Sequence, residues 1–190
     1  KDYPAGLTCH VRDPKVFACE GRYYMVLGAR TLEDKGEVLV LESTDKLHWT
    51  HINTLTTPEP FGYMWECPDL FQLKNESCMD RWVFISADGY YFVGDFDGYR
   101  FTGYTRRRMA YLGTLPYAAQ TWANVNGRVL MTAWLRTANT GKPWRGTMSL
   151  PLELSLGGAE ERLCLAPARE LLAARQVPLP PIGNRPPACG

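Results

Sequence analysis

Short runs of β-branched and aromatic residues follow one another along most of the chain, and turn residues separate them. Glu20-Gly21, Asp88-Gly89 and Asn126-Gly127 lie between neighbouring runs, and a glycine after such a residue is typical of a β-hairpin turn. Only residues 167–175 have the composition of a helix. The pattern therefore predicts an all-β fold built from antiparallel hairpins. The expected strands are residues 16–19, 22–29, 38–42, 48–52, 70–73, 82–87, 90–95, 99–104, 120–124, 129–135, 147–151 and 162–166.

These expected strands fall into three groups that look like repeats. Pro14-Lys15-Val16-Phe17 recurs 54 residues later as Pro68-Asp69-Leu70-Phe71, and a four-strand unit of about 50 residues is typical of a propeller blade. An antiparallel sandwich would also give closely spaced strands, but the repeated Pro-x-aliphatic-Phe sequence favours the propeller. We expect blades at about residues 10–55, 64–105 and 115–166, which are too few to close a ring. The prediction is a partial β-propeller over residues 1–166, followed by a short helix and a Pro-rich linker or tail over residues 167–190.

Composition and charge exclude several classes of partner. The 190 residues carry a formal net charge of +1, with 45% hydrophobic and 22% charged residues, as is usual for a soluble globular domain. A charge near zero gives no reason to expect binding to nucleic acid or to an anionic membrane. No apolar run approaches the roughly 18 residues that a membrane-spanning helix needs.

Six cysteines are scattered singly along the chain, without the spacing of a zinc site. We therefore expect no metal and no cofactor. Reduced thiols in a cytoplasmic protein are the preferred interpretation, although a disulfide framework is also open. The sequence leaves the oligomeric state undetermined.

Polar residues stand just before the first expected strand of each blade, where the chain enters the mouth of a propeller channel. Arg12-Asp13 precede the first of these strands, Glu66 the second and Tyr117 the third. We expect Asp13, Glu66 and Tyr117 at equivalent positions around one axis. Two carboxylates and an arginine at one pocket indicate a glycosidase, in which one carboxyl group donates a proton. The alternative is that these acidic residues cap loops or form surface ion pairs.

Four sequence blocks follow one another along the chain: residues 10–17 (HVRDPKVF), 63–71 (YMWECPDLF), 117–121 (YAAQT) and 148–154 (MSLPLEL). Together, in this order, they resemble glycoside hydrolase family 32, which includes invertases, sucrose-6-phosphate hydrolases, levanases and inulinases. The resemblance extends from about residue 8 to about residue 175. It implies a five-bladed propeller that releases fructose from sucrose, sucrose 6-phosphate or fructans by a retaining double displacement, with a small-molecule or oligosaccharide fructoside as its substrate.

The resemblance assigns roles to the acidic residues. Asp13 is implied to stabilise the transition state by holding fructosyl hydroxyls, and Arg12 to orient the carboxylates. Glu66 is implied to be the general acid and base. Its position between Trp65 and Cys67 predicts a pKa raised by desolvation, which would keep the acid protonated.

Aromatic residues are candidates for the walls of the sugar site, because their faces stack on the apolar faces of sugar rings. Tyr117, Trp65 and Trp134 are the expected walls, and Cys67 belongs to the same expected substrate-binding set. The remaining expectation is that Trp82, Trp122 and Trp144 are core residues.

The chain departs from the family pattern in three places. The family's nucleophile is an aspartate in an N-terminal Asn-Asp-Pro block, and only Asp2 precedes the Arg12-Asp13 block here. We therefore expect the nucleophile and two blades to be absent, so that this chain alone is inactive. The C-terminal β-sandwich of the family is also not expected, and Leu115-Pro116-Tyr117 stands where the family has Asp-Phe-Tyr. Two alternatives remain: a non-catalytic or degenerate carbohydrate-binding propeller, and an interaction scaffold of repeat type.

Overall fold

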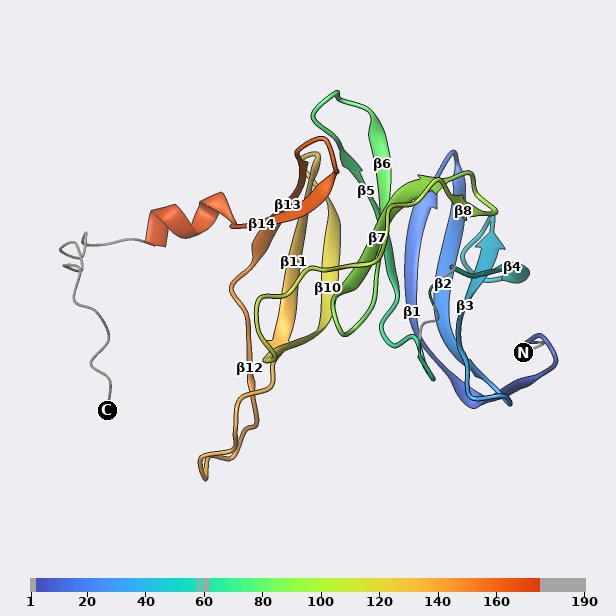
Figure 1. Cartoon of the computed structure of the whole chain (residues 1–190), viewed down its shortest axis with the longest axis horizontal. Helices are drawn as coiled ribbons and strands as arrows, with labels where there is room; N and C mark the ends of the chain where they lie inside the picture. The colour runs from blue at the N-terminus through green and yellow to red at the C-terminus, as the bar shows by residue number, and fades with distance from the viewer. Residues whose placement is uncertain (1–2, 58, 60–61, 175–190) are drawn as a thin grey trace.

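The chain folds into three antiparallel sheets that lie side by side (Figure 1). The computed structural model describes residues 3–57, 59 and 62–174. In each sheet, strands that follow one another along the chain are mostly neighbours, so local hairpins build the sheets. The first sheet contains β1 (Leu7–Cys19), β2 (Arg22–Thr31), β3 (Gly36–Ser43) and β4 (Thr50–Leu55).

The second and third sheets each carry one short additional strand. In the second sheet β9 pairs with β7, and in the third sheet β12 pairs with β11. The second sheet contains β5 (Asp69–Lys74), β6 (Asp80–Ile85), β7 (Tyr90–Phe96), β8 (Phe101–Thr102) and β9 (Arg108–Met109). The third contains β10 (Pro116–Val125), β11 (Arg128–Leu135), β12 (Thr147–Met148), β13 (Leu152–Gly157) and β14 (Arg162–Pro167).

The all-β prediction is confirmed, and the hairpin signals lie where expected. Asn126 and Gly127 join β10 to β11 with φ values of 51° and 73°, which is the backbone that a two-residue hairpin turn with two positive φ angles requires. The main error concerns residues 147–151, where the structure has only the two-residue β12 before Pro151. The missed strand is β13, whose residues Leu152, Leu154 and Leu156 contribute to the core between the second and third sheets.

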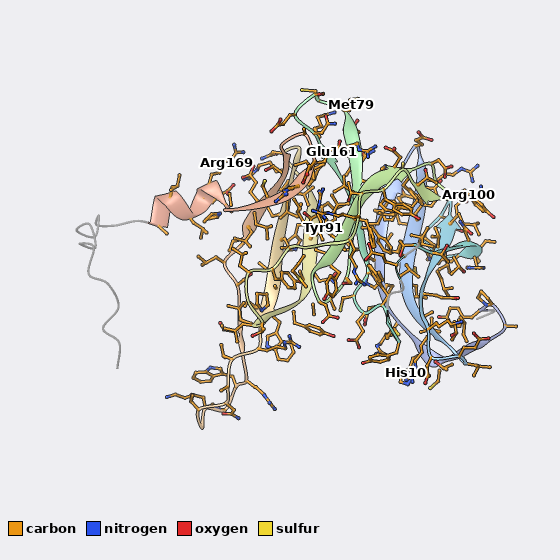
Figure 2. All side chains as sticks on the ribbon, in the orientation of Figure 1. His10, Met79, Tyr91, Arg100, Glu161 and Arg169 are labelled. Carbon is orange, nitrogen blue, oxygen red and sulfur yellow. The ribbon has the colours of Figure 1, made fainter. Side chains whose placement is uncertain are left out.

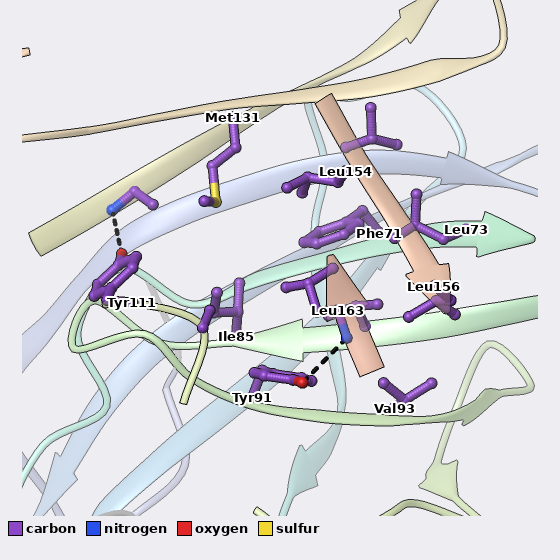
Figure 3. Packing of buried hydrophobic residues seen from close by; sticks show 14 of the residues in the cluster. Phe71, Leu73, Ile85, Tyr91, Val93, Tyr111, Met131, Leu154, Leu156 and Leu163 are labelled. Carbon is purple, nitrogen blue, oxygen red and sulfur yellow. Dashed lines mark hydrogen bonds between the residues drawn. The ribbon is translucent and has the colours of Figure 1, made fainter. Parts of the chain in front are cut away.

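The second sheet is buried on both faces, because it lies between the other two sheets. Adjacent residues of its strands point to opposite faces, so each strand contributes to both cores. On one face it packs against the third sheet, where Met131, Leu154, Leu156 and Leu163 complete the core (Figure 3). The Tyr91 hydroxyl accepts a hydrogen bond from the Leu163 amide at 3.1 Å in this core. The other face, with Leu70, Trp82, Phe84, Phe92 and Phe96, packs against the first sheet.

A buried polar cluster, Lys15–Asp69–Thr121, joins the first strands of all three sheets. Lys15 Nζ donates to Asp69 Oδ2 at 2.9 Å and to the Thr121 carbonyl at 2.7 Å. The same Asp69 oxygen accepts the Thr121 amide at 3.0 Å and its hydroxyl at 2.8 Å. The Asp69 side chain is fully buried. This cluster therefore fixes β1, β5 and β10 relative to one another.

The helical signal near the end of the described chain corresponds to a single 3-10 helix, η1 (Arg169–Ala174). Arg128 of β11 pairs with Glu170 of this helix, although η1 projects away from the sheets (Figure 1). Among the described residues no helix has both the length and the apolar character needed to span a bilayer. Residues 175–190, expected to form a Pro-rich tail, lie outside the described part.

Candidate active site

The same backbone kink occurs in or next to the first strand of each sheet: inside β1, just before β5 and inside β10. Asp13, Cys67 and Ala118 have φ values of 61°, 44° and 51°, in a region that residues other than glycine adopt rarely. In β1 the pairing register shifts between Arg12 and Lys15, and in β10 it shifts between Tyr117 and Gln120. Such bulges redirect the side chain next to them.

This kink defines the equivalent positions of the repeat. The residues directly before it are Arg12, Glu66 and Tyr117. The expectation that Asp13 is equivalent to Glu66 and Tyr117 is therefore wrong by one residue. Asp13 occupies the kinked position itself, as Cys67 does in the second sheet.

The three equivalent side chains meet at the carboxylate of Glu66. Arg12 Nη2 donates to Oε1 at 2.6 Å, and the Tyr117 hydroxyl donates to Oε2. Each oxygen of Glu66 thus has a donor from a different neighbouring sheet. The Arg12 and Glu66 side chains are 36% and 28% exposed, so a ligand can reach this group. Arg12 Nη1 also lies 2.9 Å from Nδ1 of His10, which is at the lower end of the first sheet in Figure 2.

The pKa of Glu66 lies below its ordinary value, contrary to the prediction that desolvation raises it. The hydrogen bond from Tyr117 is the largest cause, and the hydrogen bond from Arg12 is the next; burial acts in the opposite direction and is weaker. Burial, and the bond to this carboxylate, raise the pKa of Tyr117. In the described structure Glu66 is therefore a carboxylate held by two donors.

Asp13 lies beside this group and is held by Cys67. Its Oδ2 accepts the Cys67 amide at 3.0 Å and the Cys67 thiol at 3.7 Å, and lies 3.9 Å from Arg12 Nε. Burial, together with the charge of Asp13, raises the pKa of the Cys67 thiol to about 12. Cys67 thus contacts Asp13 through both its amide and its thiol, and the expected role of Cys67 in binding substrate stays a prediction.

Two glycines of the first sheet allow the segment before Glu66 to lie close to Arg12. Gly28 pairs with Arg12 across β1 and β2, and a Cβ atom there would lie 2.2 Å from the Trp65 carbonyl oxygen. At Gly36 a Cβ atom would lie 2.8 Å from the Met64 carbonyl carbon. Our sequence analysis missed both residues. A glycine inside a strand is the signal of close backbone approach that could have identified them.

Hydrogen bonds through Ala87 and Tyr111 connect the backbone of Glu66 to the third sheet. The Ala87 amide donates to the Glu66 carbonyl at 2.8 Å, and the Ala87 carbonyl accepts the Ala118 amide at 2.9 Å. The buried Tyr111 hydroxyl donates to the Ala87 carbonyl at 3.3 Å and accepts the Ala119 amide at 3.2 Å. Tyr111 is a third residue that sequence reasoning missed, because its partners lie on separate segments.

The expected aromatic walls separate into a core residue and surface residues. Trp65 is 3% exposed and stacks on Phe84 at 4.7 Å, so its interpretation as a sugar wall is wrong. Trp134 is 37% exposed and lies directly opposite Tyr117 in the pairing of β10 with β11. A role for Trp134 and Tyr117 in binding sugar stays a prediction.

The core interpretation holds for one of the other three tryptophans. Trp82 is buried between the first and second sheets, as expected. Trp122 and Trp144 are exposed, so the core interpretation is wrong for both. Trp122 follows the buried Thr121 on β10 and therefore points to the opposite face of the strand.

The described cysteines and acidic residues do not assemble a metal site. Within residues 3–57, 59 and 62–174, no group of three or more His, Cys, Asp or Glu side chains could hold a metal ion. Cys9, Cys19, Cys67, Cys78 and Cys164 are free thiols. Cys189 lies outside the described residues.

The chain matches the family model described as "Glycosyl hydrolases family 32 N-terminal domain" over residues 1–167. It is 32% identical to the sucrose-6-phosphate hydrolase of Bacillus subtilis over 205 aligned residues, which cover 91% of this chain and 41% of that protein. It is 36% identical to the probable sucrose-6-phosphate hydrolase of Vibrio cholerae over 147 residues, covering 70% of this chain and 26% of the relative. The chain thus spans less than half the length of these relatives.

Solved structures with the same fold include two fructoside-cleaving enzymes. Fructan 1-exohydrolase IIa from Cichorium intybus, solved in complex with 1-kestose, aligns with a TM-score of 0.73 and 22% identity, over 92% of this chain and 38% of that one. Sucrose-6-phosphate hydrolase from Lactobacillus gasseri aligns with a TM-score of 0.69 and 22% identity, over 90% of this chain and 39% of that one.

Proposed function

This chain belongs to glycoside hydrolase family 32, and on that premise we propose that the protein that carries it hydrolyses O-glycosyl bonds and releases fructose. The substrates are fructosides such as sucrose, sucrose 6-phosphate or fructans. The observation that carries the proposal is the Glu66 carboxylate, which Arg12 and Tyr117 hold from two neighbouring sheets within the matched span. Similarity to sucrose-6-phosphate hydrolases supports it.

The architecture that we propose for this activity is part of a five-bladed propeller. The three sheets would be blades of residues 10–55, 64–105 and 115–166, within a catalytic domain of residues 1–166. Supporting this assignment, each sheet is largely a meander, and the first strands of the three sheets meet at the Lys15–Asp69–Thr121 cluster. Their kinked ends would then lie at the channel mouth.

In the proposed mechanism Glu66 acts first as an acid and then as a base. A carboxylate attacks the anomeric carbon while Glu66 gives its proton to the leaving oxygen, and water then releases fructose as Glu66 takes a proton back. None of the described residues is assigned as the attacking carboxylate. Asp13, held by Cys67, would hold fructosyl hydroxyls.

The acid role requires a change at Glu66 when substrate binds. Both of its oxygens already accept hydrogen bonds, and these bonds favour the ionised form. We propose that the fructoside takes the place of one donor at the carboxylate, which raises the pKa of Glu66 and allows it to carry the proton. Arg12, which is more exposed than Glu66, is the donor that a sugar hydroxyl can replace.

Substitution of Glu66 by glutamine, in the full-length protein that contains this chain, tests the proposal. We expect release of fructose from sucrose to fall by about 10²–10⁴-fold, because the proton for the leaving oxygen is lost. An aryl fructoside should lose less, since its leaving group needs little protonation. The matched control is Glu33→Gln, at an exposed glutamate of the β2–β3 turn. Undiminished turnover in Glu66→Gln would contradict the acid role. If the unmodified protein binds sugar but shows no turnover, the result would indicate a non-catalytic carbohydrate-binding propeller.

A cytoplasmic location is also a proposal. It is supported by the five described cysteines, which are free, as expected for a protein in a reducing compartment. Alkylation of the native protein with a thiol reagent, followed by mass spectrometry, should find the exposed Cys9 and Cys78 modified without prior reduction.

A further inference from the structure

Arg136 lies at the edge of the candidate active site, at the end of β11. Its Cζ atom is 4.3 Å from the centre of the Tyr117 ring, and the hydroxyl of the same ring donates to Glu66. The guanidinium therefore lies about one tyrosine ring away from the proposed acid. Within the described part of the chain, no carboxylate forms an ion pair with Arg136.

The Arg136 side chain is held in place without using most of its donors. Nη2 donates to the Thr114 carbonyl at 3.1 Å, and the Arg136 amide donates to the Leu115 carbonyl at 2.9 Å. The contact with the face of Tyr117 adds a cation–π attraction. A guanidinium has five N–H donors in a planar fork, so donors remain for a ligand.

The neighbouring surface suits a sugar. Trp134 lies directly opposite Tyr117 across the β10–β11 pairing, and Arg136, two residues further along, points to the same face as Trp134. One face of the sheet thus presents a half-exposed indole, a tyrosine and an unpaired guanidinium beside Glu66. An aromatic side chain can stack on a hexose ring, while a guanidinium binds an anionic group with two hydrogen bonds.

We propose that Arg136 binds the phosphate of the leaving group, so that the preferred substrate is a fructoside whose leaving hexose carries a phosphomonoester. The inference rests on the proposed function. Glu66 protonates the oxygen that leaves with the hexose, and in sucrose 6-phosphate the phosphate is attached to C6 of that same hexose, so a group that binds it must lie about one sugar ring away from Glu66. A phosphomonoester carries a charge of about −1.5 to −2 at neutral pH, whereas sucrose and fructans present only hydroxyls at this position.

The test is the ratio of kcat/KM for sucrose 6-phosphate to that for sucrose, measured with the full-length protein. We expect Arg136→Gln to lower this ratio by about 10- to 100-fold, the effect of losing hydrogen bonds between charged groups. Arg136→Lys, which keeps the charge but loses the planar fork, should lower it less. The matched control is Arg100→Gln, because Arg100 also lies over a tyrosine ring, that of Tyr99. In Figure 2 Arg100 lies at the opposite end of the first two sheets from His10, which contacts Arg12 of the candidate active site. An unchanged ratio in Arg136→Gln would overturn the inference.

A binding measurement separates this inference from the proposed function. Calorimetric titration with glucose 6-phosphate, glucose and inorganic phosphate should show the tightest binding for glucose 6-phosphate, and Arg136→Gln should remove that preference. This result would support the phosphate site even if the protein released no fructose from any fructoside, which would refute only the proposed function. Equal binding of glucose 6-phosphate by both proteins, or inorganic phosphate binding as tightly as the sugar phosphate, would overturn the inference.

Discussion

Replacing Tyr117 by phenylalanine removes a single hydroxyl, which is the strongest influence on the protonation of Glu66. A hydrogen bond to a charged group contributes about 1.5–3 kcal/mol, and 1.36 kcal/mol corresponds to a change of one in pKa. Glu66 keeps its bond to Arg12 at 2.6 Å, and its side chain is 28% exposed, so water replaces part of the lost bond. We therefore expect the pKa of Glu66 to rise, because the carboxylate loses about 1.5 kcal/mol of stabilisation, the lower end of the range.

Carbon-13 NMR of glutamate side-chain carboxyls in this chain would measure the change directly. The Glu66 resonance is identified by its loss in Glu66→Gln, and Tyr99→Phe, at an exposed tyrosine of the second sheet, is the control. A pKa of Glu66 that stays the same or falls in Tyr117→Phe would refute the assignment of Tyr117 as the main stabiliser of the carboxylate. In the full-length enzyme, the alkaline limb of kcat/KM should move to higher pH, because the protonated acid persists further.

The same substitution has a consequence for stability. A carboxyl group whose pKa is lower in the folded than in the unfolded state stabilises the fold above its unfolded pKa, and this stabilisation is lost as the pH falls through the folded pKa. The hydrogen bonds to Glu66 act in this sense. Tyr117→Phe should therefore reduce the free energy of unfolding at neutral pH and make it less dependent on pH under acidic conditions. Urea titrations at several pH values would measure this dependence.

Two further substitutions test how the sheets hold the site. Asp69→Asn should lower the free energy of unfolding by about 3–5 kcal/mol in urea titration, because it breaks a buried pair and leaves Lys15 without its carboxylate. Exposed ion pairs contribute about 1 kcal/mol or less, so a loss below about 1 kcal/mol would contradict this role. Gly28→Ala should cost about 1–3 kcal/mol and disturb the Glu66 resonance, since its Cβ would lie 2.2 Å from a backbone oxygen. Gly157→Ala, where the nearest atom is the Cys164 sulfur at 3.1 Å, is the control, and equal effects would refute the steric argument.

The sequence alone determined the fold class and the residues on which the proposed chemistry rests. Alternation of apolar residues and hairpin turns such as Asn126-Gly127 are local properties, so strands and turns can be read from neighbouring residues. The recurrence of the Pro14 block at Pro68 revealed the repeat. The sequence identifies Glu66, Arg12 and Tyr117 as candidates, and the structure shows all three in contact.

Only the tertiary structure decided how those residues act. The pKa of Glu66 depends on donors 54 and 51 residues away, and no local pattern shows that their hydrogen bonds outweigh its burial. Whether a tryptophan is buried depends on which sheet covers its face: Trp65 lies beneath the site, whereas Trp122 is exposed. The offset between Pro14 and Pro68 already aligns Asp13 with Cys67 in the sequence, but the kinked backbone that both residues share is visible only as a positive φ angle. Local sequence therefore determines strands and turns, while protonation and burial are properties of contacts that exist only after the sheets have packed together.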